Sequence, residues 1–205
     1  MLLSALKQTS PGRITVVLED ETEIRSSLAV VTDLRLFAGK ELDEAALREL
    51  RRLSRRALAR DRALEFLSRR PMSCRELRDK LIEKGEDESD ADACVQWLLE
   101  QGFLDDERYA AMVVRHYAAK NYGAARLRQE LNRRGIPREL WDGALADAPE
   151  PDDKLDRFIA ARLSDPTDKD QIRKVSNALF RRGYGWEQIR DALRRCTDTI
   201  YEESP

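Results

Sequence analysis

Residues 73–85 have the sequence SCRELRDKLIEKG, which contains both ends of one helix. Ser73 and Glu76 have the spacing of a capping box, in which the Ser hydroxyl and the Glu carboxylate accept hydrogen bonds from free amides of the first turn. Gly85 follows the last apolar position, where helices often end in a left-handed residue that glycine adopts without steric cost. Lys84, directly before it, interacts favourably with the helix dipole. The segment therefore predicts a short helix between Ser73 and Gly85.

The same pattern occurs three times, at a period of about 48 residues. Each copy has two apolar residues four positions apart, then a glycine after another four, with a basic residue before the glycine. Self-similarity at a fixed period indicates that one supersecondary unit is repeated and stacked. Stacked units usually offer a surface to a partner rather than a catalytic pocket. The copies are Leu77/Leu81/Gly85, Leu127/Leu131/Gly135 and Val175/Leu179/Gly183.

The surrounding apolar residues recur at helical spacing and predict three helices in each unit. We expect a mainly α protein of tandem three-helix, helix-turn-helix-like repeats that form an elongated curved body. The expected helices are 57–70, 73–84 and 89–101 in the first unit, 106–119, 123–134 and 137–147 in the second, and 152–163, 169–182 and 186–195 in the third.

The first 50 residues have a different pattern. β-branched residues predict a short N-terminal β-hairpin with strands at 13–19 and 22–25, followed by a small helix at 28–36. Asp43 is a start signal for a long helix that continues through Arg56. The expected domains are a hairpin-bearing extension at 1–50, the three repeats at 51–104, 105–149 and 150–198, and a tail at 199–205.

Composition limits the classes of protein that fit this chain. Charged residues are 37% of the sequence, against about a quarter in typical domains, and acidic and basic blocks alternate beneath a net charge of −2. A general nucleic-acid coat is therefore disfavoured, while local basic surfaces could meet phosphate or an acidic protein. No apolar run approaches the roughly 18 residues of a spanning helix, and no secretory signal precedes the hairpin. We expect a soluble cytoplasmic protein without membrane contact, and a monomer because no heptad seam is sustained.

Catalytic and metal-site signatures are absent from the sequence. His116 is the only histidine, so it has no second histidine with which to bind a metal or form a triad. The three cysteines contain no C-x-x-C pair, and there is neither a phosphate-binding P-loop nor a nucleophile elbow. We expect a protein that is not an enzyme and has no cofactor and no metal.

Basic residues recur along the middle helix of the units. Arg126 and Arg133 lie two turns apart on nearly one face, and Lys174 and Arg181 occupy the corresponding places in the third unit. Their repetition predicts a stripe that follows a phosphate backbone or an acidic protein groove, although a solvated face explains the same pattern. The candidate partner-binding or DNA-binding residues are Arg75, Arg78, Tyr122, Arg126, Arg128, Arg133, Arg134, Lys174 and Arg181.

In combination, these residues resemble the RecX family of bacterial regulators of the RecA recombinase. The likeness covers roughly residues 55–195, about two thirds of the chain, and is loosest in the third unit. It rests on Ala63-Leu64 with Leu67 and Arg70, Ser73-x-x-Glu76-Leu77-x-x-Lys80-Leu81-x-x-Lys84-Gly85, Gly102-Phe103-Leu104-Asp105-Asp106-x-x-Tyr109-Ala110, and Tyr122-Gly123-x-x-Arg126-Leu127-x-x-Glu130-Leu131-x-x-Arg134-Gly135-Ile136.

The resemblance implies a non-enzymatic protein of tandem three-helix repeats that binds in the groove of the RecA nucleoprotein filament on single-stranded DNA. Such proteins restrain ATP hydrolysis, strand exchange and self-cleavage of the SOS repressor, and so affect DNA repair and recombination. Direct contact with single-stranded DNA is compatible with this role. The hairpin-bearing extension is a departure from the short members of the family, and its role stays open.

Two alternatives come from other classes. Residues 73–104 also resemble a helix-turn-helix fragment, so a transcription regulator that reads duplex DNA in the major groove is the main alternative. Against it, the unit recurs twice more and no strand pair for a wing follows Leu104. A purely structural helical scaffold is the other alternative, and it would have no effect on recombinase activity.

Overall fold

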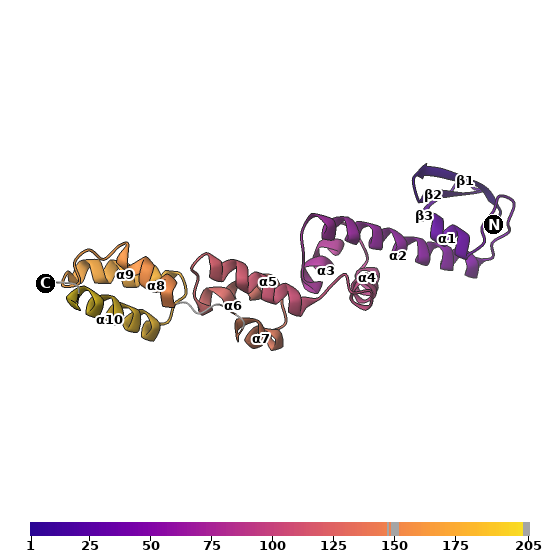
Figure 1. The fold of residues 1–205 in the computed structure, drawn as a ribbon. Coiled ribbons are helices and arrows are strands. Elements are labelled where there is room, and N and C mark those ends of the chain that lie inside the picture. Colours follow the sequence, from indigo (N-terminus) through magenta and orange to yellow (C-terminus); the bar gives the residue numbers. More distant parts are fainter. Residues whose placement is uncertain (147, 149–151, 203–205) are drawn as a thin grey trace. The chain divides into compact units, whose positions relative to one another are not determined.

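The computed structural model describes residues 1–146, 148 and 152–202, without the side chains of 152–154 and 198–202. It is mainly helical, with one small antiparallel sheet at the N-terminus (Figure 1). The chain divides into two compact units, Met1–Leu104 and Asp105–Pro205. The expected fold class of tandem three-helix repeats behind an N-terminal β-hairpin is confirmed.

The N-terminal sheet has three strands in the order β1-β2-β3. The predicted hairpin corresponds to β2 (Arg13–Leu18) and β3 (Glu23–Ser27), whose register pairs Thr15 with Arg25. The sequence did not predict β1 (Leu3–Ser10), because this strand has one fully buried residue, Leu3, and lacks the β-branched alternation that marks strands. Pairing with β2, rather than its own pattern, makes it a strand.

The sheet packs against two helices and so obtains the hydrophobic partner that an isolated hairpin lacks. Val16 and Leu18 are buried together with Val30 of α1 (Leu28–Asp33) and with Leu50 of α2 (Glu44–Arg69). α1 is shorter than the predicted helix at 28–36. These contacts fix the sheet over the N-terminal half of α2.

α2 is a single helix of 26 residues, capped by the Asp43 carboxylate, which accepts from the amide of Ala46 at 2.7 Å. The predicted start of a separate helix at residue 57 is therefore wrong. The physical reason is that the sequence from 44 to 69 contains neither glycine nor proline and is rich in good helix formers. One helix consequently supports both the sheet and the first three-helix repeat.

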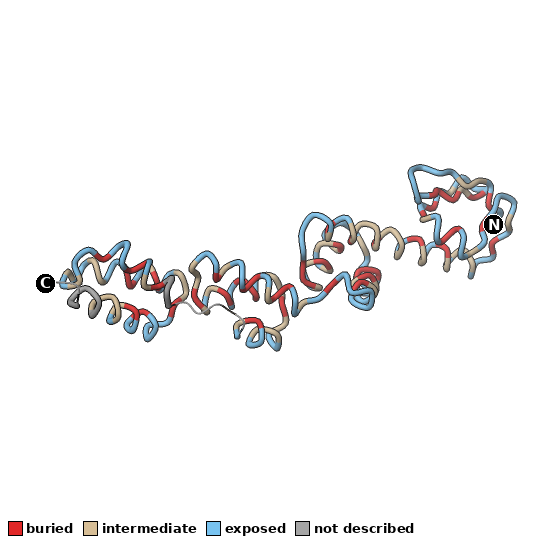
Figure 2. Tube along the Cα trace, in the orientation of Figure 1, coloured by how far each residue is buried: buried red, intermediate tan, exposed pale blue. Residues whose placement is uncertain are grey.

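The first repeat consists of the C-terminal half of α2 with α3 (Cys74–Glu83) and α4 (Glu88–Glu100). Its capping box is present, since the amide of Glu76 donates to Ser73 Oγ at 3.0 Å and the amide of Ser73 donates to Glu76 Oε2 at 3.3 Å. Leu77 and Leu81 are fully buried. Figure 2 shows buried residues along the inward faces of these helices.

The second unit contains six α-helices among its described residues. The second repeat has α5 (Asp106–Ala119), α6 (Ala124–Arg133) and α7 (Trp141–Ala146), and the third has α8 (Asp152–Ala160), α9 (Lys169–Arg181) and α10 (Trp186–Glu202). Two predicted helices differ. The one expected at 137–147 begins as a 3₁₀ turn at Arg138–Leu140, and α10 continues past the expected end at 195.

The repeated glycine has the predicted role in all three copies. Gly85, Gly135 and Gly183 follow α3, α6 and α9 with φ angles of 91°, 65° and 91°, the left-handed region that L side chains rarely adopt. Each therefore ends its helix, and the motif that the sequence repeats is a helix C-terminus.

Candidate partner-binding surface

A buried carboxylate organises the basic residues of α6. Glu130 is 3% exposed and its carboxylate forms ion pairs with three arginines of α6 and its C-terminal cap. Arg133 Nη2 and Arg134 Nη1 lie 2.8 and 2.7 Å from Glu130 Oε2, and Arg126 Nη2 lies 3.0 Å from Glu130 Oε1. These arginines lie three or four positions from Glu130, the spacing that places side chains together on a helix. Three of the predicted binding residues are thus joined around one internal anion.

Two opposed effects set the charge state of Glu130. Burial raises its pKa, but hydrogen bonds from Arg133 and Arg134 lower it, and the net result is a pKa below the ordinary value. Two opposite effects also act on the pKa of Arg134. Burial lowers its pKa, while hydrogen bonds to Tyr117 and Glu130 raise it above the ordinary value. Glu130 is therefore an ionised carboxylate that neutralises part of the predicted basic stripe.

The second and third repeats meet where the end of α9 reaches the beginning of α6. The amide of Gly123 donates to the carbonyl of Arg182 at 2.8 Å, and the amide of Ala125 donates to the carbonyl of Gly183 at 3.1 Å. The first amides of a helix and its last carbonyls have no partners within the helix, so each end here satisfies the other. The opposite ends of the two helix dipoles also meet, which is favourable.

Two glycines permit this approach. A Cβ on Gly123 would lie 2.4 Å from the carbonyl oxygen of Gly183, and a Cβ on Gly183 would lie 2.4 Å from the amide nitrogen of Arg126. Gly123 has an ordinary φ of −83°, so space rather than backbone conformation requires glycine there. The Tyr122-Gly123 pair thus has a structural role at the start of α6.

Tyr122 lies between two cations at this junction. The guanidinium of Arg126 is 5.8 Å from the ring centroid and that of Arg182 is 5.7 Å from it. Arg182 also donates to the carbonyls of Lys120 and Asn121, at 3.2 and 3.3 Å, and lies 4.9 Å from the ring of Phe158. Both Tyr122 and Arg182 are only partly exposed. Their internal contacts occupy much of the surface that a partner could reach.

The remaining candidates of this unit are different, because they face solvent. Arg128 of α6 and Lys174 and Arg181 of α9 are exposed, and none makes an ion pair or side-chain hydrogen bond with any residue that the structure describes. Their charges are therefore available to a partner. We call Arg128, Lys174 and Arg181 the free cations.

An aromatic pair that the sequence did not assign lies next to Arg181. Phe180 and Trp186 are 51% and 56% exposed, and their rings stack with centroids 5.0 Å apart and an interplanar angle of 19°. Exposed Trp residues are common anchors at protein interfaces. The signal for this pair in the sequence was weak, because the two residues are six positions apart. The turn at Gly183, which lies between them, brings their rings together.

Arg75 and Arg78 belong to α3 in the other unit. Arg75 is exposed and lies 3.8 Å from Asp79. Arg78 donates to Asp92 of α4 at 2.5 Å, and this hydrogen bond raises its pKa above the ordinary value, with Glu88 at 3.4 Å as a second partner. Arg78 therefore links α3 to α4, and Arg75 is the more accessible of the two.

Two kinds of site are absent from the described residues. These residues include no group of three or more His, Cys, Asp or Glu side chains placed to hold a metal ion. Throughout the part of the chain that the structure describes, no helix is long and apolar enough to cross a bilayer.

Comparison with known proteins agrees with this architecture. Residues 59–98 match the family model for the first three-helix domain of RecX, and residues 105–145 match the model for its second three-helix domain. A crystal structure of regulatory protein RecX superimposes with a TM-score of 0.74 at 24% identity, over 93% of this chain and 98% of that chain. RecX from Lactobacillus salivarius gives a TM-score of 0.63 at 20% identity, over 70% and 97%.

Curated relatives show the same relationship at higher identity. Regulatory protein RecX of Vibrio parahaemolyticus is 34% identical over 138 residues, which cover 66% of this chain and 89% of the relative. RecX of Shigella dysenteriae is 38% identical over 151 residues, covering 67% and 91%. With its first two repeats matching in order and most of each relative covered, this chain belongs to the RecX family of regulatory proteins.

Proposed function

We infer that this protein binds the RecA filament on single-stranded DNA and restrains its activity, including ATP hydrolysis, strand exchange and SOS-repressor cleavage. Family membership supports the choice of partner. The observation that carries the proposal is the set of free cations on α6 and α9, whose charges no described residue neutralises. The protein acts as a cytoplasmic monomer and as a binding protein rather than an enzyme.

The free cations suit a charged groove of a filament. Arg128, Lys174 and Arg181 can meet carboxylates of a protein or phosphates of DNA, and such exposed charges raise association rates and give salt-dependent binding. The Phe180–Trp186 pair adds an apolar anchor beside Arg181. The cluster around Glu130 holds α6 in shape, so that it supports the surface without being its main contact.

The transcription-regulator alternative has less support. A winged-helix protein would need a strand pair after Leu104, but α5 begins at Asp106. Most of the segment that resembles a helix-turn-helix, residues 73–98, also lies in a region that matches RecX, residues 59–98. Sequence-specific regulators prefer their site by about 1000-fold or more over other duplexes. We expect no such preference here.

The test is the ATP hydrolysis rate of RecA on single-stranded DNA, titrated with this protein from well below one copy per RecA. The wild type should inhibit ATP hydrolysis at low ratios. An Arg128→Ala/Lys174→Ala/Arg181→Ala variant should need a concentration at least about tenfold higher for the same inhibition. An Arg108→Ala/Arg115→Ala/Arg157→Ala variant changes the same charge at other exposed positions of the second unit and serves as the control. No inhibition at saturating ratios by folded wild type would refute the proposal.

A further inference from the structure

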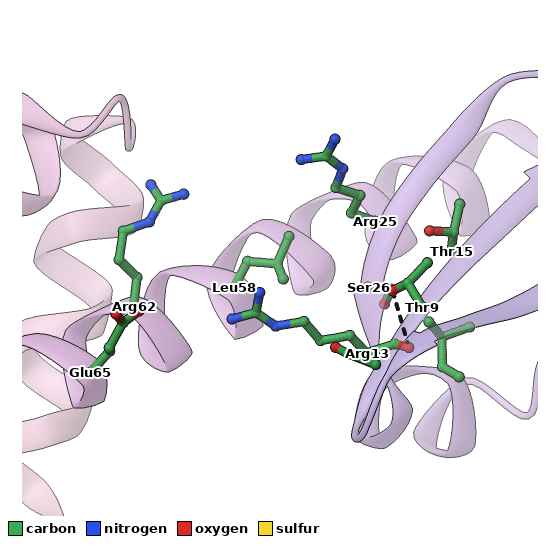
Figure 3. Close-up of a pocket in the computed structure, with 10 residues that line it drawn as sticks. Thr9, Arg13, Thr15, Arg25, Ser26, Leu58, Arg62 and Glu65 are labelled. Atoms are coloured by element: carbon green, nitrogen blue, oxygen red, sulfur yellow. Dashed lines mark hydrogen bonds between the residues drawn. The ribbon is translucent and has the colours of Figure 1, made fainter.

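A polar cleft opens between the N-terminal sheet and α2 (Figure 3). It has a volume of about 520 Å³ and is lined by residues of all three strands and of the middle of α2. Arg13 and Arg25 extend from the sheet toward α2, and Arg62 extends from α2 on the other side, so that three guanidinium groups border one space. The hydroxyl side chains of Thr9 and Thr15 lie on the sheet side.

The lining has an excess of positive charge. Glu65 is its one acidic residue, and that carboxylate already accepts from Arg69 at 2.6 Å. Arg25 is exposed and makes no side-chain ion pair or hydrogen bond with the described residues. Arg13 has only a distant partner, Asp61 at 3.9 Å. Both strand arginines are therefore available to an anion.

Arg62 differs from the two strand arginines because it already has close hydrogen-bond partners. Its Nη1 donates to Glu86 Oε1 at 2.5 Å and to the carbonyl of Lys84 at 3.1 Å. A guanidinium has five N–H donors, so these two bonds leave donors that can face the cleft. Arg62 is thus held in place by one end of the first repeat while it contributes charge to the cleft.

The chemistry of the lining favours a polyanion over an ordinary small molecule. Small-molecule pockets of this volume are mostly apolar, with few polar groups, whereas this cleft has three arginines and several hydroxyls. Guanidinium groups bind both phosphate and carboxylate through paired hydrogen bonds. Two classes of chain therefore fit the charge: a nucleic-acid backbone and an acidic peptide.

Main-chain hydrogen bonding favours one of these two classes. A bound peptide needs partners for its own amides and carbonyls, and extended peptides obtain them from a free strand edge. Arg13, Ile14 and Thr15 belong to β2, the central strand, which is paired on both sides, whereas Thr9 and Arg25 belong to the outer strands β1 and β3. Leu58, Arg62 and Glu65 lie within α2, where main-chain groups bond to each other. A phosphodiester chain has no amides to satisfy and needs only cations and hydroxyl donors.

We propose that this cleft binds a phosphodiester segment of a nucleic-acid backbone through Arg13, Arg25 and Arg62. None of its lining residues is aromatic, so the contact is with phosphates and is independent of base sequence. The site lies in the N-terminal extension and the adjoining part of α2, whereas the free cations belong to the other unit. It gives the extension a role of its own and does not depend on a contact with RecA.

The test uses the full chain without RecA and measures fluorescence anisotropy of labelled oligothymidylate across a salt series. Changing Arg13→Gln and Arg25→Gln should weaken binding and reduce the slope of log affinity against log salt by about 1.4, since each single-strand phosphate contact contributes about 0.7. Arg115→Gln/Arg157→Gln removes the same charge elsewhere on exposed surface and should leave the slope nearly unchanged. Both strand arginines are exposed, and circular dichroism checks that the fold persists.

A second variant tests the same site without removing an arginine. Thr9→Glu places a negative charge in the cleft at an exposed position and should weaken oligothymidylate binding several-fold. Absent binding by wild type, or equal slopes for the Arg13/Arg25 variant and its control, would overturn the proposal. Displacement of oligothymidylate by oligoglutamate at equal charge concentration would also overturn it and assign the cleft to acidic peptides.

Failure of this proposal and failure of the proposed function give different results. The oligothymidylate assay contains no RecA, and the RecA assay compares substitutions at Arg128, Lys174 and Arg181. A protein can therefore pass one test and fail the other.

Discussion

The amide of Gly123 donates a hydrogen bond to the carbonyl of Arg182 at 2.8 Å, although the two residues are 59 positions apart in the chain. This bond joins the beginning of α6 to the end of α9 and leaves no room for a side chain on either facing glycine. Because unpaired helix termini are costly when they are shielded from water, the junction stabilises both repeats at once. The presentation of the free cations on α6 and α9 depends on it.

Replacing Gly123 with Ala should destabilise the docking of the third repeat. The added Cβ would lie 2.4 Å from the oxygen of Gly183 and 2.6 Å from the amide nitrogen of Tyr184, which are backbone atoms that cannot rotate away. Overpacking of this kind costs about 1–3 kcal/mol. We expect urea unfolding to lose that much free energy and amide hydrogen exchange in α8, α9 and α10 to accelerate.

Gly143→Ala is the matched control for that substitution. Gly143 lies in α7, and a Cβ there meets nothing within 4 Å. Replacing glycine by alanine inside a helix usually stabilises by about 0.5–1 kcal/mol. Equal effects of the two substitutions would show that Gly123 is not required for space at the junction.

Glu130→Gln should destabilise the second repeat by about 1–3 kcal/mol at neutral pH, because it removes the shared anion of three arginines. It should also change the response to acid. The pKa of Glu130 is below its ordinary value of 4.5 in the folded chain, so its contribution is complete above that pH and is lost as the pH falls through the lower, folded-state pKa. The glutamine variant should lose less stability over this acid range than wild type does.

The measurement is the free energy of unfolding at a series of pH values from neutral to strongly acidic. Glu139→Gln removes a carboxylate that is exposed and serves as the control. If wild type and the Glu130 variant had parallel pH profiles, the carboxylate would not be stabilised by its arginines. Simultaneous replacement of Arg126, Arg133 and Arg134 would disrupt the same cluster, so that variant measures stability together with binding.

Much of this fold follows from local signals. Ser73 and Glu76 predicted the start of α3, and the repeated Gly85, Gly135 and Gly183 predicted three helix ends, because capping and left-handed backbone depend on neighbouring residues only. β1 was missed because its pairing with β2 decides its conformation. Position 57 was predicted as a helix start although no breaker is present to interrupt α2.

The site was less predictable than the fold. The spacing of Arg126, Glu130 and Arg134 at four-residue intervals was a visible signal for the buried cluster, since such residues are neighbours on a helix. The junction of Gly123 with Gly183 had no such signal. A repeat period predicts that units stack, but the packing of side chains determines which surfaces meet.

Cys94 should be almost inert in the folded protein. It is 2% exposed, and burial raises its pKa from 9.0 to about 11. At pH 8 this shift alone lowers the reactive thiolate fraction about 100-fold. In a Cys74→Ser/Cys196→Ser variant, reaction with a disulfide reagent should therefore be slow in buffer and fast in urea. Rapid labelling in buffer would mean that the first repeat opens readily.

Removing the exposed aromatic pair should weaken partner binding without unfolding the protein. Phe180 and Trp186 stack on each other and are more than half exposed, so Phe180→Ala/Trp186→Ala removes little from the core. Aromatic anchors at interfaces contribute about 2 kcal/mol or more, which corresponds to at least about 30-fold in affinity. Phe37→Ala is the control, because Phe37 is 60% exposed and lies in the other unit.

The readout is the affinity for RecA filaments by sedimentation or anisotropy, with circular dichroism as the check on folding. A weaker double variant, with Phe37→Ala unchanged, would place the anchor beside Arg181 in the contact. If both variants bound like wild type, the pair would be a solvent-exposed stack without a role in binding, and the free cations alone would have to account for the affinity. Because the charged contacts are the same in both proteins, the double variant should keep the salt slope of wild type and lose a constant factor in affinity at every salt concentration.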